Sequence, residues 1–141
     1  MLEVVASFIN TLEEKEIKYR HTAPEKDGDR EIIRVGYKGD HGNDLDFVFI
    51  FDDNNRSVNI KVWSICKVSE EKLVDMYVTL NELNYEYRWI KLYLDSDNEV
   101  TLSGDAVLSE MSAGDECFEL LVRYLGILDD IFPRLMKVIW A

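Results

Sequence analysis

The sequence contains few of the residues from which catalytic and metal sites are usually built. Its 141 residues include only two cysteines, Cys66 and Cys117, and two histidines, His21 and His41. The cysteines lack the paired spacing of a zinc site, so we expect two buried free thiols in a reducing compartment. The histidines fall on an expected edge strand and in an expected loop, where solvated side chains are commoner than catalytic ones.

Motifs for binding phosphate, activating a nucleophile or holding calcium are also missing. The seven glycines are scattered and form neither a phosphate-binding loop nor the sharp turn that presents a catalytic serine. Acidic clusters begin at Asp40 and Asp95, but neither has the glycine at position six that an EF-hand loop needs. Hairpin-turn chemistry is the preferred interpretation of both clusters. We therefore expect no catalytic residue, no metal site and no cofactor.

Basic residues are few, and long apolar runs are absent. Sixteen Lys and Arg against 28 Asp and Glu give a net charge of −12, which argues against binding to nucleic acid or to anionic membranes. The absence of an 18-residue apolar run and of a signal-peptide pattern predicts no membrane span and a cytoplasmic location. The acidic surface is compatible with a basic protein partner, although a solvated shell that maintains solubility is the commoner meaning.

The chain does contain enough apolar residues for a sizeable core. Hydrophobic residues make up 47% of the sequence and aromatic residues 11%, which favours one domain over residues 1–141. Apolar residues recur at helical spacing from Leu2 to Glu14, and the alternation from Ile17 to Thr22 suits a short edge strand. Three further segments alternate with period two between turn-forming residues, which predicts an antiparallel meander of Glu31–Lys38, Leu45–Asp52 and Val58–Ile65.

The stretch from Ser69 to Val107 organises the rest of the chain. Ser69 suits a helix N-cap, and apolar residues follow it at every third or fourth position, namely Leu73, Met76, Tyr77, Leu80 and Leu83. From Tyr87 to Leu94 the period changes to two, so we expect a strand whose aliphatic side chains point to the core. A turn at 95–98 leads into a returning strand that begins at Val100 and is expected to end at Gly104.

The run from Leu80 to Leu108 carries a more specific pattern. Its features are Leu80, Asn81, Leu83 and Asn84 before the strand, the strand end Lys91–Asp95, the Asp97-Asn98 turn and the return Val100–Leu102. This pattern resembles the YbjN family, described as bacterial sensory-transduction regulators, although the family usually has an Asp-Gly turn. The family fold is similar to class I type III secretion chaperones. The resemblance implies the order helix, three strands, helix, two strands, helix, and it carries no catalytic residue.

The last predicted helix has more apolar surface than one sheet can cover. It begins after Ser112, which can cap it. One apolar stripe comprises Cys117, Leu121, Tyr124, Leu128, Ile131, Leu135 and Val138. A second stripe comprises Phe118, Val122, Leu125, Phe132, Met136 and Ile139. Pro133 is expected to bend or break the helix near Asp129. The predicted fold class is α+β, with an antiparallel sheet of five or six strands and helices mainly on one face.

Exposed aromatic residues supply the candidate binding surface. Tyr87, Trp89 and Tyr93 share one face of their expected strand, and they mark a binding surface if the last helix leaves them uncovered. If the helix covers them, the same rings belong to the core. The candidate partner-binding or dimer surface is Trp63, Tyr87, Trp89, Tyr93, Phe118, Val122 and Phe132.

Two functions follow from these observations. We expect a non-enzymatic protein-binding or regulatory domain that resembles secretion chaperones and forms a homodimer, with a protein partner that the sequence does not identify. The surplus apolar surface motivates the dimer, and the likeness to secretion chaperones motivates the protein client. The alternative is a small-ligand-binding domain or small enzyme with a pocket between the sheet and the C-terminal helix.

Overall fold

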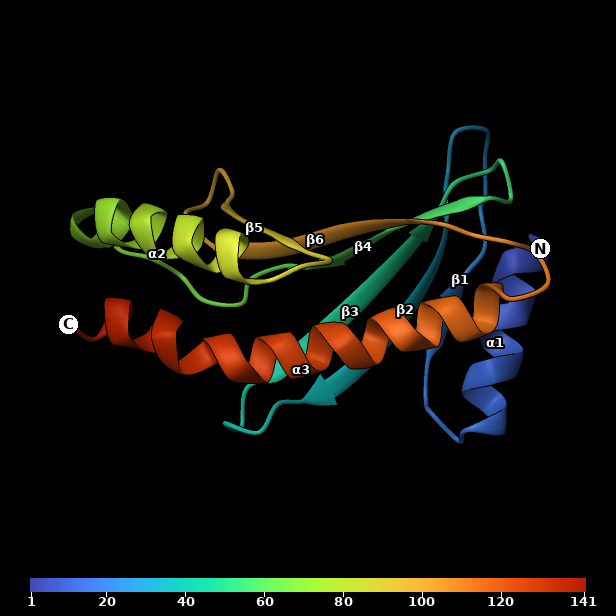
Figure 1. Ribbon diagram of the computed structural model, residues 1–141. Helices are drawn as coiled ribbons and strands as arrows, with labels where there is room; N and C mark the ends of the chain where they lie inside the picture. The colour runs from blue at the N-terminus through green and yellow to red at the C-terminus, as the bar shows by residue number, and fades with distance from the viewer.

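The structure is a six-stranded antiparallel sheet that carries three α-helices (Figure 1). The computed structural model describes residues 1–141. The sheet order is β1-β2-β3-β4-β6-β5. In chain order the elements are α1 (Glu3–Glu14), β1 (Arg20–Thr22), β2 (Glu31–Lys38), β3 (Asp44–Phe51), β4 (Ser57–Val62), the short 3-10 helix η1 (Glu70–Lys72), α2 (Leu73–Glu86), β5 (Lys91–Leu94), β6 (Val100–Val107) and α3 (Ala113–Ile139). The predicted α+β class and element order are confirmed, and β1 is the sixth strand.

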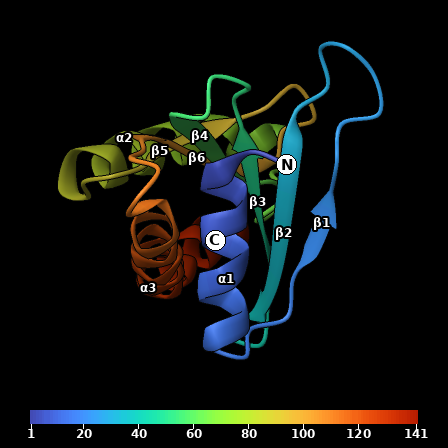
Figure 2. The ribbon, with the colours of Figure 1, turned by 90° about the vertical axis from the view of Figure 1, so that its right-hand side faces the viewer.

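The three helices cover one face of the sheet. Every second residue from Leu45 to Phe51 in β3 is buried, and β4 shows the same alternation from Val58 to Val62. These side chains join apolar residues from α1, α2 and α3 in one core of 28 buried residues. Figure 2 shows α1 and α3 on the same side of β2. The prediction that the helices lie mainly on one face is therefore confirmed.

Three predicted boundaries differ from the structure. The Ser69 side chain makes no capping hydrogen bond, and a turn of 3-10 helix precedes α2. The third strand of the meander ends at Val62, because Ser64 has a left-handed backbone with a φ of +56° that extended pairing does not allow. In the other direction, β6 continues through Gly104 to Val107, since its whole length pairs with β4.

The predicted strand from Tyr87 to Leu94 is wrong over its first half. Tyr87 closes α2, and β5 begins only at Lys91. Between them Trp89 adopts a φ of +79°, which no strand residue has. The alternation that placed Tyr87, Trp89 and Tyr93 on one strand face is therefore interrupted, and these three aromatic side chains do not form a shared face.

Helix α3 continues through Pro133 as a single helix of 27 residues, so the expected break is not present. Proline has no N–H, and the Asp129 carbonyl therefore loses its helical donor. The ring of His41, in the β2–β3 loop, donates a hydrogen bond from Nε2 to that carbonyl over 3.1 Å. The Asp129 carboxylate accepts the Asp40 N–H at 2.9 Å. None of the helices has both the length and the apolar character needed to cross a bilayer.

Candidate functional site

A strained tryptophan is displayed between α2 and β5. Trp89 has a left-handed backbone, which is a genuine outlier for a bulky side chain, and its side chain is 51% exposed. The Tyr124 hydroxyl donates a hydrogen bond to the Trp89 carbonyl at 3.0 Å. Tyr124 is fully buried in α3, and burial, together with the negative charge of Asp105, raises its pKa to about 12. The Trp89 backbone is therefore fixed by a hydrogen bond from a buried residue of the core.

Gly104 in β6 leaves the space that this contact needs. A Cβ atom at Gly104 would lie 2.0 Å from the Tyr124 hydroxyl oxygen and 2.9 Å from the Trp89 carbonyl oxygen. Both distances are shorter than any van der Waals contact, so another residue here would push the tyrosine and the bend apart. Gly104, Tyr124 and Trp89 are thus one packed unit that fixes where the indole stands.

Two arginines lie against the Trp89 ring. The guanidinium carbons of Arg88 and Arg123 are 4.8 and 5.2 Å from the ring centre, within cation–π range. Arg123 also donates to Glu119, one helical turn earlier, at 2.8 Å. Arg88 forms no ion pair within the chain. In a protein with a net charge of −12, this pair is a local concentration of positive charge.

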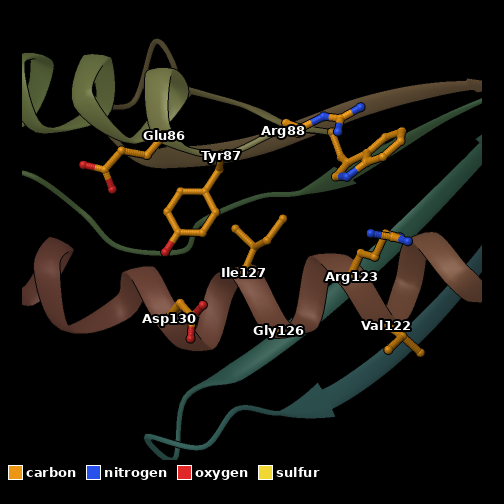
Figure 3. Close-up of a pocket in the computed structure, with 9 residues that line it drawn as sticks. Glu86, Tyr87, Arg88, Val122, Arg123, Gly126, Ile127 and Asp130 are labelled. Atoms are coloured by element: carbon orange, nitrogen blue, oxygen red, sulfur yellow. The ribbon is translucent and has the colours of Figure 1, made fainter.

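A groove of about 490 Å³ runs from these arginines along α3. Tyr87 and Ile127 line its apolar centre, and Figure 3 shows Arg88 and Arg123 at one end and Glu86 and Asp130 at the other. Burial, with the negative charges of Asp130 and Glu86, raises the pKa of Tyr87, against a smaller lowering effect of Arg134. The groove is therefore positive at one end and negative at the other.

Gly126 lies in the middle of the groove and in the middle of α3. A Cβ atom there would meet nothing within 4 Å. Glycine in a helix interior destabilises the helix by about 1 kcal/mol relative to alanine, and no neighbouring group in this chain requires the gap.

A second hollow of about 420 Å³ lies beyond Trp89 and Arg123, next to Glu116 and Leu120.

The outer surface of α2 carries four exposed apolar residues, which the sequence pattern did not predict. Val74 is 71% exposed, Tyr77 55%, Val78 55% and Tyr85 91%. The pattern had placed Tyr77 with the buried residues of this helix, but Met76, Leu80 and Leu83 are the buried ones. The spacing of Val74, Val78 and Tyr85 is itself helical and was the signal that could have revealed this second stripe. We call these four residues the α2 stripe.

The remaining predicted surface residues are dispersed. Trp63 follows β4 and is 42% exposed. Tyr93 lies on the sheet face that has no helix, where its hydroxyl accepts a hydrogen bond from Lys61 Nζ at 3.2 Å. Val122 is 52% exposed and lines the groove with Tyr87 and Trp89. Phe118 and Phe132 are half-buried: Lys15 Nζ lies 4.4 Å from the centre of the Phe118 ring, and the ring centres of Phe132 and His41 are 5.5 Å apart.

The predicted alternative, a pocket between the sheet and the last helix, has a counterpart in the hollow of about 420 Å³, which is lined by Ala106 of β6 and by Glu116 and Leu120 of α3. Beneath the middle of α3 the space is filled by side chains that are at most 1% exposed, among them Leu121, Tyr124 and Leu128. No group of three or more His, Cys, Asp or Glu side chains could hold a metal ion. Both cysteines are free, and burial raises the pKa of each thiol to about 12, with a smaller contribution from Glu99 at Cys66 and Glu116 at Cys117.

Both histidines are exposed, as expected, and each also contacts a partner within the chain. The His21 ring contacts the carboxylate of Glu31, which is 2% exposed and also accepts the Leu2 N–H at 2.9 Å. His41 is held by α3 through Asp129 and Phe132. The His21 contact spans ten residues between the neighbouring strands β1 and β2, whereas the His41 contact spans 88 residues, from the β2–β3 loop to α3.

The six-stranded antiparallel sheet and the helices on one of its faces define a small α+β protein. The chain belongs to the YbjN family: the family model, described as "Putative bacterial sensory transduction regulator", matches residues 5–136. The crystal structure of YbjN, described as "a putative transcription regulator from E. coli", is similar in fold, with a TM-score of 0.61, 10% identity and coverage of 93% of both chains. No curated protein matches the chain.

Proposed function

We propose that this protein is a non-enzymatic regulatory domain, formed by residues 1–141, that acts in the cytoplasm by binding proteins and is itself a homodimer. Membership in a family of regulators supports the regulatory class. The net charge of −12 favours a protein rather than a nucleic acid as the partner. The likeness to secretion chaperones, noted from the sequence, supports a protein client.

The observation that carries the proposal is the α2 stripe. Its four residues are each more than half exposed, and large apolar side chains gathered on one exposed face are typical of interaction sites. The stripe has apolar residues at both ends, Val74 and Tyr85, so a second copy running antiparallel would cover it end to end. Closed two-fold pairing of one patch with itself is the commonest arrangement of homo-oligomers.

The experiment is a comparison of two valine substitutions in analytical ultracentrifugation. Val78→Glu places a charge in the middle of the α2 stripe, and we expect it to shift the protein from dimer to monomer. Val107 is a matched control, because it is 81% exposed on β6, away from the stripe. Val107→Glu should leave the dimer intact. Dissociation by both substitutions, or by neither, contradicts the assignment of α2 as the dimer surface.

A further inference from the structure

We propose that the groove beside Gly126 binds an extended peptide segment of another protein, with an acidic residue and a basic residue about 10 Å apart and apolar side chains between them. This inference rests on the proposed protein-binding function and names the chemistry of the partner. Its site is separate from the α2 stripe, so the two proposals can fail independently.

The charges of the groove specify the charges of the occupant. Arg88 and Asp130 lie at opposite ends (Figure 3), and neither forms an ion pair within the chain. Their neighbours are already engaged: Arg123 pairs with Glu119 at 2.8 Å and Glu86 with Arg134 at 2.6 Å. A carboxylate from the occupant would satisfy Arg88, and an ammonium or guanidinium group would satisfy Asp130.

The spacing follows from the geometry of α3. Arg123 marks the positive end, because it and Arg88 both lie against the Trp89 ring. Arg123 is seven residues before Asp130, which is about 10 Å at 1.5 Å per residue. An extended peptide covers the same distance between residues i and i+3. A volume of about 490 Å³ lies within the range of small-ligand sites, which suits a few extended residues better than a helix about 10 Å in diameter.

Gly126 provides the room for a peptide backbone to approach α3. No atom of this chain would contact a side chain's Cβ at position 126. Glycine therefore makes the helix less stable than alanine would, and no contact within the chain requires it. Glycine is the residue used where another backbone must come close. Gly126 thus leaves the middle of the groove, between its positive and negative ends, free of a side chain.

The Trp89 bend makes the positive end rigid before anything binds. Backbone strain of this kind persists only where the surrounding structure fixes it, and it is concentrated at ligand clamps. Tyr124 and Gly104 supply that constraint. A preformed wall lowers the ordering cost of association, so even a short segment can be recognised.

The test uses four blocked tetrapeptides and ¹⁵N-labelled protein. Two carry mixed charges, acetyl-Glu-Leu-Leu-Lys-amide and acetyl-Lys-Leu-Leu-Glu-amide, since either chain direction fits the groove. Two carry charges of one sign, with Glu or Lys at both ends. We expect at least one mixed peptide to shift the Trp89 indole and Gly126 amide signals saturably in the millimolar range, and the uniform peptides to bind about tenfold more weakly, a difference of about 1.4 kcal/mol.

Variants assign the binding to the groove. Arg88→Glu should weaken the mixed peptide about tenfold or more, whereas Arg56→Glu, a matched change at an exposed arginine outside the groove, should not. Gly126→Leu should block binding while the folded spectrum and dimer are retained. The proposal is overturned if no peptide shows saturable shifts up to about 10 mM, if all four bind equally, or if the shifts centre on the α2 stripe. If the unmodified protein is a dimer but binds none of the peptides, this inference is contradicted while the proposed homodimer stands.

Discussion

The His41 ring donates its Nε2 hydrogen bond, 3.1 Å long, to the carbonyl of Asp129, the group that Pro133 deprives of a helical partner. The imidazole also stacks on Phe132, with ring centres 5.5 Å apart. A loop residue thus replaces the missing backbone donor in a helix that continues to Ile139.

The first prediction concerns this replacement. Pro133→Ala restores the backbone N–H and should raise the free energy of unfolding by about 1–3 kcal/mol. His41→Ala should lower it by about 1 kcal/mol in the natural sequence and by less in the Pro133→Ala background, because Asp129 then has its helical donor. Urea denaturation of the four proteins measures this coupling. Equal costs of His41→Ala in both backgrounds would contradict it.

The second prediction concerns the support of Trp89. Gly104→Ala should destabilise the fold by about 2 kcal/mol or more, because the new Cβ would lie 2.0 Å from the Tyr124 hydroxyl oxygen. Tyr124→Phe removes the hydrogen bond to the Trp89 carbonyl and should cost about 1 kcal/mol. Chemical denaturation gives both values. A Gly104→Ala protein as stable as the parent would show that the bend is not packed as described.

The third prediction concerns Gly126 as a site where stability is not optimised. Gly126→Ala should raise the free energy of unfolding by about 0.5–1 kcal/mol, because the added methyl group meets nothing within 4 Å. Thermal or urea unfolding measures the gain. Gly104→Ala is the contrasting case within the same chain, and a destabilising effect at both glycines would mean that α3 is covered at Gly126.

The fourth prediction is a pH dependence at the β5–β6 turn. Asp95 accepts the N–H groups of Glu99 and Asp97 at 3.1 and 2.9 Å. The Glu99 contact is the largest effect that lowers the Asp95 pKa, burial opposes it, and the Asp97 N–H and the Thr101 hydroxyl add smaller lowering effects. A depressed folded-state pKa gives stability that is present above the unfolded pKa and is lost as pH falls through the folded value.

Asp95→Asn tests that sign. The variant should be less stable than the parent near neutral pH, and the difference should shrink as the pH falls from about 5 through the ordinary aspartate pKa of about 3.9 and on through the lower folded-state pKa. Denaturation midpoints across this range provide the measurement. A difference that stays constant or grows on acidification would show that the carboxylate charge does not stabilise the turn.

Periodicity predicted the meander well because both of its faces are set by local alternation. Glu31–Lys38 forms β2 with the predicted boundaries, and the core alternation of β3 and β4 follows the sequence. The same reasoning failed at Trp89, since its backbone is held by Tyr124, 35 positions away. No local pattern contains that contact.

The candidate binding surface, too, could be predicted from the sequence only in part. Trp89 and Val122 could be selected from the sequence as exposed apolar residues, but their meeting in one groove depends on how α3 crosses the end of α2. Tyr77 was placed on the wrong side of its helix, because two apolar stripes compete on α2 and only tertiary packing decides which one is buried. Pro133 predicted a helix break that the structure does not have, and the hydrogen bond from His41 to the Asp129 carbonyl comes from a distant loop.

Sedimentation equilibrium of the unmodified protein over a wide concentration range tests the central claim most directly. If the α2 stripe serves to bind protein and is covered by a second copy, the molar mass should reach twice the chain mass of 16.5 kDa and fall toward the monomer on dilution. A mass that stays at the single-chain value at every concentration would contradict the homodimer and leave the stripe without its proposed occupant.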